Sequence, residues 1–187
     1  MLETERLILR HFTENDLEDY WEYVQMPSVG PRAGWPAYTD KEKAKERLLY
    51  ETTNPNQYAV VLKSENKVIG QVELMNCKRD RYPIADIEPN AREIGIVSNE
   101  KYWGNGYMTE AVKEIMRYAF IDLEVPAIYI GHAKANIGSG RLQDKCGFNI
   151  IGEIPNYRTW VDGTQTDFIA RKMTREEYFK KEECEYT

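Results

Sequence analysis

The chain has 187 residues, 42% of them hydrophobic and 30% charged, a composition that suits one folded domain with one sizeable core. Its net charge of −6 argues against nucleic-acid binding, because a basic face supplies most of the affinity for nucleic acid. No apolar run approaches the roughly 18 residues that span a bilayer, and Met1 to Arg6 do not resemble a signal peptide, so we expect a cytoplasmic protein with no membrane partner.

Metal binding and disulfide formation are not expected either. The cysteines, Cys77, Cys146 and Cys184, are widely spaced, and no pair has the spacing of a zinc site. The histidines, His11 and His132, are too far apart to form one. We interpret Cys146 as a buried apolar side chain and His132 as a strand residue with a hydrogen-bond partner.

The first half of the chain predicts strands separated by helices. Alternating apolar residues indicate strands, and Thr13 and Thr39 have side chains that favour the N-cap of a helix. A segment rich in proline and glycine predicts a loop, which carries Trp35 and Tyr38. In chain order, the expected elements are a strand at 6–10, a helix at 14–24, the loop at 26–38, a helix at 40–50 and a hairpin of strands at 58–62 and 67–74.

The second half predicts a strand, a helix and a strand, followed by a shorter helix and a hairpin. Apolar residues from Met108 to Ala119 fall on one helical face. Gly147 can take the left-handed conformation that ends a helix, and Thr174 can cap another. The expected elements are strands at 92–97 and 127–131 around the helix that starts near 108, a helix at 139–146, strands at 148–160 and 164–173 joined by a turn at Asp162 and Gly163, and a terminal helix after 174.

This order of elements predicts a mixed sheet covered by helices. The strand–helix–strand unit from Glu93 to Ile130 requires a parallel pairing with a right-handed crossover. The hairpins on either side of it require antiparallel pairing.

Gly104 and Gly106 lie between a predicted strand and the helix that follows. Glycine can turn the backbone with positive φ, and a helix start presents unpaired N–H groups with a partial positive charge. Together they predict a site for phosphate or diphosphate, although a glycine pair at such a junction can equally be a simple turn. A dinucleotide fingerprint is excluded because Thr109 stands at its third glycine position, and the Gly-Lys-Ser/Thr of a Walker loop is missing.

Four segments carry a resemblance to a known family. Residues 135–148, Ala-Asn-Ile-Gly-Ser-Gly-Arg-Leu-Gln-Asp-Lys-Cys-Gly-Phe, resemble the Asn-x-x-Ser…Lys-x-Gly-Phe signature of the GNAT acetyltransferases. Residues 101–106, Lys-Tyr-Trp-Gly-Asn-Gly, resemble their acetyl-CoA motif. Residues 4–10, Thr-Glu-Arg-Leu-Ile-Leu-Arg, and 92–96, Arg-Glu-Ile-Gly-Ile, are similar to the branch that acetylates the N-termini of ribosomal proteins. The resemblance ends near Met173, so we expect an acetyltransferase domain at 1–173 and a C-terminal helix or tail at 174–187.

The resemblance implies an α/β (α+β) fold of the GNAT type, with a mixed, mostly antiparallel central sheet, one splayed pair of parallel strands and helices on both faces. It implies acetyl-CoA as co-substrate and no metal. The pantetheine arm would enter between the strands of Val97 and Ile128, and the diphosphate would lie on the amides of the glycine turn. Lys101 stands where the motif usually has Arg or Gln. The expected cofactor-binding residues are Ile96, Val97, Lys101, Trp103, Gly104, Asn105, Gly106, Tyr107, Met108, Thr109, Asn136, Ser139, Arg141 and Lys145.

Amide formation from a thioester needs a neutral amine, a polarised carbonyl and a proton for the leaving thiolate. Glu93 is the candidate base, acting through water, and a contact to the substrate ammonium is an alternative role. Ser139 is the candidate acid, and the N-cap of its helix is the alternative. Gln143 stands where many family members have a tyrosine, and it cannot act as an acid. Trp35, Tyr38 and Glu93 are the expected substrate-binding residues.

The sequence therefore predicts an N-acetyltransferase that transfers an acetyl group from acetyl-CoA to a primary amine by direct attack. The expected acceptor is the α-amine at a protein N-terminus. Two alternatives stay open, namely acetylation of a small amine such as an amino acid, polyamine or aminoglycoside, and CoA binding without catalysis. We expect a monomer or a homodimer.

Overall fold

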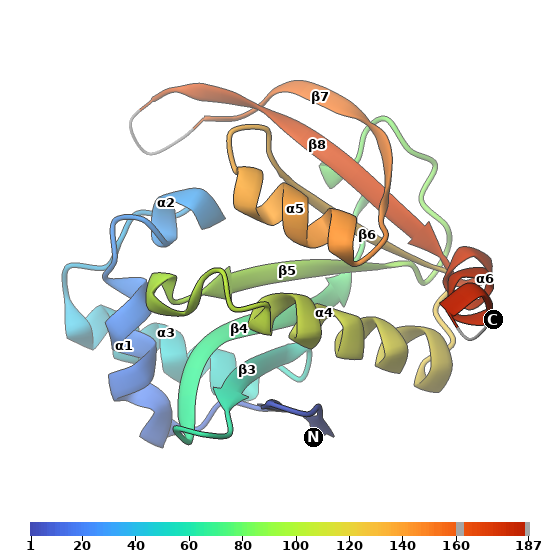
Figure 1. The fold of residues 1–187 in the computed structure, drawn as a ribbon. Coiled ribbons are helices and arrows are strands. Elements are labelled where there is room, and N and C mark those ends of the chain that lie inside the picture. The colour runs from blue at the N-terminus through green and yellow to red at the C-terminus, as the bar shows by residue number, and fades with distance from the viewer. Residues whose placement is uncertain (160–162, 186–187) are drawn as a thin grey trace.

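The computed structural model describes residues 1–159 and 163–185. They contain an eight-stranded sheet in the order β1-β2-β3-β4-β5-β6-β8-β7 (Figure 1). The strands are β1 (Leu2–Glu3), β2 (Leu7–Arg10), β3 (Gln57–Leu62), β4 (Lys67–Asn76), β5 (Arg92–Ser98), β6 (Ala127–Ala133), β7 (Asn149–Thr159) and β8 (Gln165–Thr174). The helices are α1 (Leu17–Val24), α2 (Gly30–Ala33), α3 (Lys41–Thr53), α4 (Tyr107–Arg117), α5 (Ile137–Lys145) and α6 (Arg175–Glu185).

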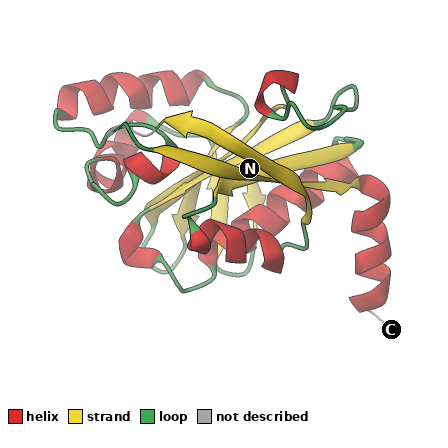
Figure 2. Ribbon diagram, turned by 90° about the horizontal axis from the view of Figure 1, so that it is seen from above, coloured by secondary structure: helices red, strands yellow, loops and turns green. Residues whose placement is uncertain are grey.

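Helices cover both faces of the sheet, and an apolar core lies under each layer (Figure 2). On one face, α4 buries Val112 and Ile115 completely against the strands, as its helical spacing of apolar residues predicts. On the other face, α1 and α3 contribute Tyr23 and Leu48 to the second core. Burial of each aliphatic side chain of this size stabilises the fold by about 1.5–3 kcal/mol relative to exposure.

The parallel strands β5 and β6 separate soon after they begin. Their register contains only the pairs Arg92 with Ile128 and Glu93 with Tyr129. Every other pair of neighbouring strands is antiparallel, and β6 pairs with β8 from Ala127 to Ala133. The expected mixed, mostly antiparallel sheet with a splayed parallel pair is therefore confirmed. Main-chain polar groups that the two strands do not use for each other need another partner, such as water or a ligand.

The predicted elements are confirmed, although several boundaries and caps differ from the expectation. Asp40, not Thr39, caps α3, because its carboxylate accepts a hydrogen bond from the Glu42 amide at 2.9 Å. Asn136, not Ser139, caps α5, since its side-chain oxygen accepts from the Ser139 amide at 3.2 Å. The predicted loop at 26–38 contains the short helix α2.

The C-terminal region begins as predicted, with Thr174 preceding a helix. Thr174 and Glu177 form a reciprocal cap, in which each backbone N–H donates to the other side chain. Helix α6 packs Tyr178 against Phe120 of the α4 core, with ring centroids 5.0 Å apart. The division of the chain at residue 173 stays a prediction. Of the predicted hairpin turn, Gly163 has φ of +84°, and Asp162 lies outside the described residues.

Candidate active site

A cleft of about 740 Å³ opens where β5 and β6 diverge. Ile96 and Val97 of β5 line one wall, and Ile130 and His132 of β6 line the other. The volume lies in the range of sites that hold a small molecule or cofactor. The cleft is bounded at one end by the glycine turn before α4 and at the other by polar side chains of β3, β4 and β5.

The glycine turn forms the first end of the cleft. Gly104 and Gly106 have φ of +82° and +80°, a conformation that glycine adopts without steric cost, and Gly106 is the N-cap of α4. A Cβ atom at Gly104 would have no neighbour within 4 Å, so the approach to this backbone is open. The first N–H groups of α4 have no partner within the helix, and its dipole places a partial positive charge beside them. This end of the cleft therefore suits an anion such as a diphosphate.

A chain of three hydrogen-bonded side chains lies along one wall of the cleft. The Nε2 atom of buried Gln143 donates to Ser139 Oγ at 3.1 Å, and its Oε1 atom lies 2.9 Å from Nδ1 of His132. Burial lowers the pKa of His132, with a further contribution from the positive charge of Arg171. A neutral ring with its proton on Nδ1 satisfies this geometry. The expectation that His132 has a hydrogen-bond partner is thus confirmed, and Gln143 connects it to the predicted acid.

The other end of the cleft has a polar floor on one face of the sheet. Gln57 of β3 pairs with Glu73 of β4, and Glu73 pairs with Gly95 of β5, so the three residues form one row across the strands. A Cβ atom at Gly95 would lie 3.0 Å from Cε of Met75 and 3.9 Å from Cβ of Glu73. A side chain at Gly95 would therefore press against Met75, so glycine fits this position of the row beside Glu73.

Glu93 lies at the same end of the cleft, and only 3% of its surface is exposed. Its carboxylate forms an ion pair with Arg81 at 2.9 Å. Because burial and the charge of Glu93 raise the pKa of the nearby Cys77 thiol to about 12, Cys77 is not a nucleophilic thiolate at neutral pH. Arg32, Arg47 and Arg141 also line the cleft, so four guanidinium groups of the described residues accompany the carboxylates of Glu73 and Glu93.

The structure brings most of the predicted site residues together in this cleft. Those among its lining are Ile96, Val97, Trp103, Gly104, Gly106, Tyr107, Met108, Thr109, Asn136, Ser139, Arg141 and Lys145 for the cofactor, and Trp35 and Glu93 for the substrate. Their placement in one cleft agrees with the prediction of a shared site. Their roles in binding or catalysis stay predictions.

Three predicted residues lie outside the lining. The Lys101 ammonium group pairs with Glu22 at 3.0 Å, so it is held against α1. The Asn105 side chain turns back and donates to the carbonyl oxygens of Tyr102 and Trp103. Tyr38 packs into the second core, with its ring centroid 5.6 Å from that of Trp35, which does line the cleft.

Gln57 and Glu73 of the floor, and Gln71, which also lines the cleft, belong to none of the recognised motifs. A sequence signal for them does exist. In β4, the polar residues Gln71 and Glu73 alternate with the apolar residues Val72 and Leu74. Such alternation places polar side chains on one face of a strand, and in a central strand this face is expected to border a cleft or a polar site.

Cys146 is buried as predicted, and burial raises the pKa of its thiol to about 12. Within residues 1–159 and 163–185, there is no cluster of three or more His, Cys, Asp or Glu side chains that could hold a metal ion. None of the helices in that part of the chain is long and apolar enough to cross a membrane.

A splayed strand pair beside a helix start that suits an anion is the kind of site expected to hold an extended ligand with a phosphate-rich end. Comparison with known proteins identifies the class more narrowly. Residues 6–149 match the family described as the acetyltransferase (GNAT) domain. The chain belongs to this family, and it is an acetyl-CoA-dependent N-acetyltransferase.

Similar proteins cover almost the whole chain. The uncharacterized N-acetyltransferase p20 of Bacillus licheniformis is 25% identical over 182 residues, which are 95% of this chain and 97% of the relative. The crystal structure of a GNAT acetyltransferase from Bacillus anthracis has a TM-score of 0.82 at 23% identity and covers 94% of this chain and 99% of that one.

Two further solved structures share the fold and have different acceptors in their names. The ribosomal-protein-S5-alanine acetyltransferase of Vibrio fischeri has a TM-score of 0.72 at 24% identity, with 94% of this chain and 96% of that chain covered. The spermidine N-acetyltransferase of Vibrio cholerae, solved with CoA and spermine, has a TM-score of 0.75 at 18% identity, with 94% and 99% covered. At these identities the comparison establishes the fold and leaves the acceptor open.

Proposed function

We propose that this acetyltransferase modifies the α-amine at the N-terminus of a protein or peptide, and that the amine attacks the thioester directly. The observation that carries the proposal is the arrangement of one continuous cleft, with the glycine turn at one end and the polar floor of β3, β4 and β5 at the other. Acetyl-CoA would lie along it, with its diphosphate on the amides near Gly106 and its thioester between β5 and β6.

Direct attack agrees with the state of the two cysteines whose side chains the structure describes, Cys77 and Cys146. An acyl-enzyme requires a nucleophile such as a thiolate, and burial raises the pKa of both Cys77 and Cys146 to about 12. In the proposed mechanism, a main-chain N–H on the open edge of β5, that of Ile96, polarises the acetyl carbonyl. The N–H of Val97 faces β4 instead, because Val97 and Gln71 form a hydrogen-bonded pair in the antiparallel register. Glu93 accepts the proton of the amine through a water molecule.

Ser139 would then return a proton to the leaving thiolate. The Gln143 amide donates to Ser139 Oγ, which occupies a lone pair of the hydroxyl and leaves its proton available to an acceptor in the cleft. Cleavage of the carbon–sulfur bond releases CoA as a thiolate, and transfer of the serine proton yields the thiol. The serine recovers its proton from solvent.

Two features favour an α-amine over a polyamine as the acceptor. An α-amine has an unperturbed pKa of about 7.7–8.0, so roughly a tenth of it is neutral at pH 7, whereas an alkyl amine near 10.4 is almost entirely charged. In addition, four arginines, Arg32, Arg47, Arg81 and Arg141, line the cleft, and among the residues that the structure describes Glu73 and Glu93 are its lining carboxylates. A polyamine would bring several positive charges to guanidinium groups, while a peptide N-terminus brings one, together with carbonyl groups that can accept hydrogen bonds.

The test combines binding and turnover. Acetyl-CoA at 100 times its dissociation constant should raise the free energy of unfolding by about 2.7 kcal/mol. Thiol release should be measured with short peptides, the same peptides with blocked N-termini, free amino acids, aminoglycosides and spermidine. Release with free but not blocked peptides is expected. Turnover restricted to spermidine or another small amine would overturn the proposed acceptor, and CoA binding without turnover of any amine would indicate a binding protein.

A further inference from the structure

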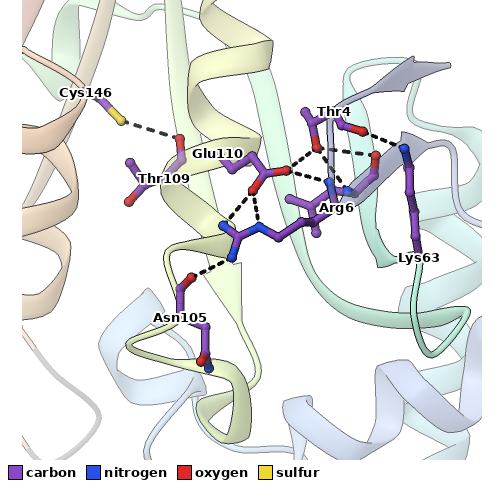
Figure 3. A network of polar contacts seen from close by, with 8 residues as sticks. Thr4, Arg6, Lys63, Asn105, Thr109, Glu110 and Cys146 are labelled. Carbon is purple, nitrogen blue, oxygen red and sulfur yellow. Dashed lines mark hydrogen bonds and ion pairs between the residues drawn. The ribbon is translucent and has the colours of Figure 1, made fainter.

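Thr4 and Arg6, in the segment before β2, converge on one side chain of α4 (Figure 3). Thr4 Oγ1 donates to Glu110 Oε1 at 2.5 Å, and the Arg6 backbone N–H donates to the same oxygen at 2.9 Å. The Arg6 guanidinium binds Glu110 Oε2 through Nε and Nη2, both at 2.6 Å. A Thr-x-Arg spacing thus satisfies both oxygens of a carboxylate that is about 100 residues away in the chain.

The segment that carries these two side chains is itself fixed. The Thr4 hydroxyl accepts the Leu7 N–H at 3.0 Å, and the Thr4 N–H donates to the Leu7 carbonyl at 3.0 Å. Lys63, beyond the end of β3, donates to the Thr4 carbonyl at 2.5 Å and pairs with Glu3 at 2.7 Å. The arginine is therefore presented from the sheet and not from a loose terminus.

The remaining part of the Arg6 guanidinium reaches the glycine turn. Its Nη1 donates to the carbonyl oxygen of Asn105 at 3.1 Å, and its planar group lies over the Tyr107 ring, 4.6 Å from the centroid. The fixed fork of an arginine can hold a carboxylate and a carbonyl at once, whereas the ammonium group of lysine is a single point charge. Arg6 is not among the residues that line the cleft, so it supports the turn from behind.

Contact with the Asn105 carbonyl sets the direction of the next amide. Within one trans peptide unit, the C=O and the N–H point to opposite sides. When the Asn105 carbonyl faces Arg6, the N–H of Gly106 faces away from Arg6, and Gly106 does line the cleft. Gly104 and Gly106 have positive φ and no side chains, and a Cβ atom at either would meet at most Arg6. Few other contacts therefore fix the orientation of the peptide between Asn105 and Gly106.

Arg6 also removes an electrostatic conflict. Glu110 lies in the first turn of α4, where its negative charge would compete with a bound anion for the positive end of the helix. Hydrogen bonds from Thr4 and Arg6 outweigh the effect of partial burial and keep the pKa of Glu110 below its usual range, so the carboxylate is ionised at neutral pH. The guanidinium beside it cancels that charge.

We propose that Arg6, oriented by Thr4 and Glu110, is a positioning residue that turns the Gly106 amide toward the diphosphate of the coenzyme. The inference rests on the proposed placement of that diphosphate. It assigns a role to the N-terminal Thr-x-Arg segment, which has no part in the acetyl-transfer chemistry. Arg6 acts on the part of the ligand that carries phosphate and not on the pantetheine arm.

The test compares ligands that have or lack the diphosphate. Affinities of wild-type protein and Arg6→Met for CoA, 3′-dephospho-CoA and pantetheine would be measured by calorimetry, with pantetheine measured by competition. CoA and 3′-dephospho-CoA share the diphosphate, and we expect each to bind the variant at least about tenfold more weakly, equivalent to 1.4 kcal/mol. Pantetheine lacks it and should change less than about twofold.

Two further variants separate positioning from general stability. Arg10→Met is the matched control, because Arg10 lies four residues after Arg6, at the end of β2, and forms a comparable fork with Asp16 at 2.7 and 2.8 Å, away from the cleft. It should leave all three affinities within about twofold. Arg6→Lys retains a charge for Glu110 and should lose an intermediate factor for the two diphosphate ligands.

The outcomes distinguish this inference from the proposed function. An equal loss for CoA and pantetheine, or no loss for either, would overturn the positioning role while acetyl transfer stands. A wild-type protein that binds none of the three ligands would overturn the proposed function together with the inference.

Discussion

Gly140 of α5 provides a test in which helix propensity and packing predict opposite signs. Replacing an interior helical glycine with alanine usually stabilises a helix by up to about 1 kcal/mol. At Gly140, however, the added Cβ atom would lie 2.8 Å from His132 Nε2 and 3.4 Å from Cε1 of the same ring. The packing of α5 on β6 at this position depends on the missing side chain.

The size of the effect follows from the constraints on the histidine ring. The His132 ring cannot rotate away without breaking its 2.9 Å hydrogen bond to Gln143, and the Gln143 side chain is fully buried. Loss of that bond costs about 1–3 kcal/mol, and accommodation of an extra methyl group in a packed interior costs about 1–3 kcal/mol. Either the hydrogen bond breaks or the methyl group is accommodated, so only one of these two costs applies. The gain in helix propensity offsets about 1 kcal/mol of it, so Gly140→Ala should lower the free energy of unfolding by up to about 2 kcal/mol.

Gly138→Ala is the matched control in the same helix. A Cβ atom there would have Asn136 Oδ1 as its nearest neighbour, at 3.8 Å, which is ordinary contact. Urea unfolding at neutral pH should show Gly138→Ala within about 0.5 kcal/mol of wild type or more stable, and Gly140→Ala less stable than both. If Gly140→Ala proved as stable as Gly138→Ala, the account of the His132–Gln143 contact would be refuted.

Other substitutions test the site and the ion pairs around it. Ser139→Ala should lower kcat about 10²-fold or more. It should also cost about 1–3 kcal/mol of stability, because the buried Gln143 amide loses its acceptor while the Asn136 cap remains, and a fall in melting temperature with unchanged kcat would remove the acid role. Lys101→Met should leave the KM for acetyl-CoA within about twofold, because Lys101 pairs with Glu22; a large rise in steady-state KM would contradict this placement. Hydrogen bonds from Lys67, Asn99 and Lys101 outweigh burial and lower the pKa of Glu22 to about 2. A lowered folded-state pKa stabilises the protein above the unfolded value near 4.5, so this contribution should be lost as pH falls from 4.5 toward 2, and Glu22→Gln should show a flatter stability profile there in acid titrations of unfolding.

The parts of the fold that the sequence predicts are those set by local periodicity and turn chemistry. The alternation in β3 and β4, the helical stripe of α4 and the glycines before it are each visible within about ten residues. The splayed pair is different, because its prediction came from family resemblance. Arg92 and Glu93 are the only residues of β5 that pair with β6. This short pairing depends on the position in which β8 holds β6, and the local sequence does not encode that position.

The differences between the expected and the observed positions of the site residues have the same physical origin, namely contacts between residues that are distant in the chain. Asn136 and Ser139 are both good cap residues, and the point at which the chain leaves β6 determines which of them caps α5. Lys101 occupies a motif position, yet Glu22, from a helix 79 residues earlier, determines where its ammonium group lies. Gln57 and Glu73 become one floor only through the register of two strands.

A chain with a net charge of −6 that binds a polyanion illustrates why net charge and local field must be separated. The proposed phosphate end of the cleft needs no excess of basic residues over the whole molecule, because main-chain N–H groups at the start of α4 supply partial positive charge at short range. The nearby carboxylate that would weaken this field, Glu110, is neutralised by Arg6. Arg141 and Lys145 add full positive charges within the lining of the same cleft. The acidic surplus therefore lies elsewhere on the described surface, where at physiological ionic strength charges more than about 8 Å from the ligand are largely screened.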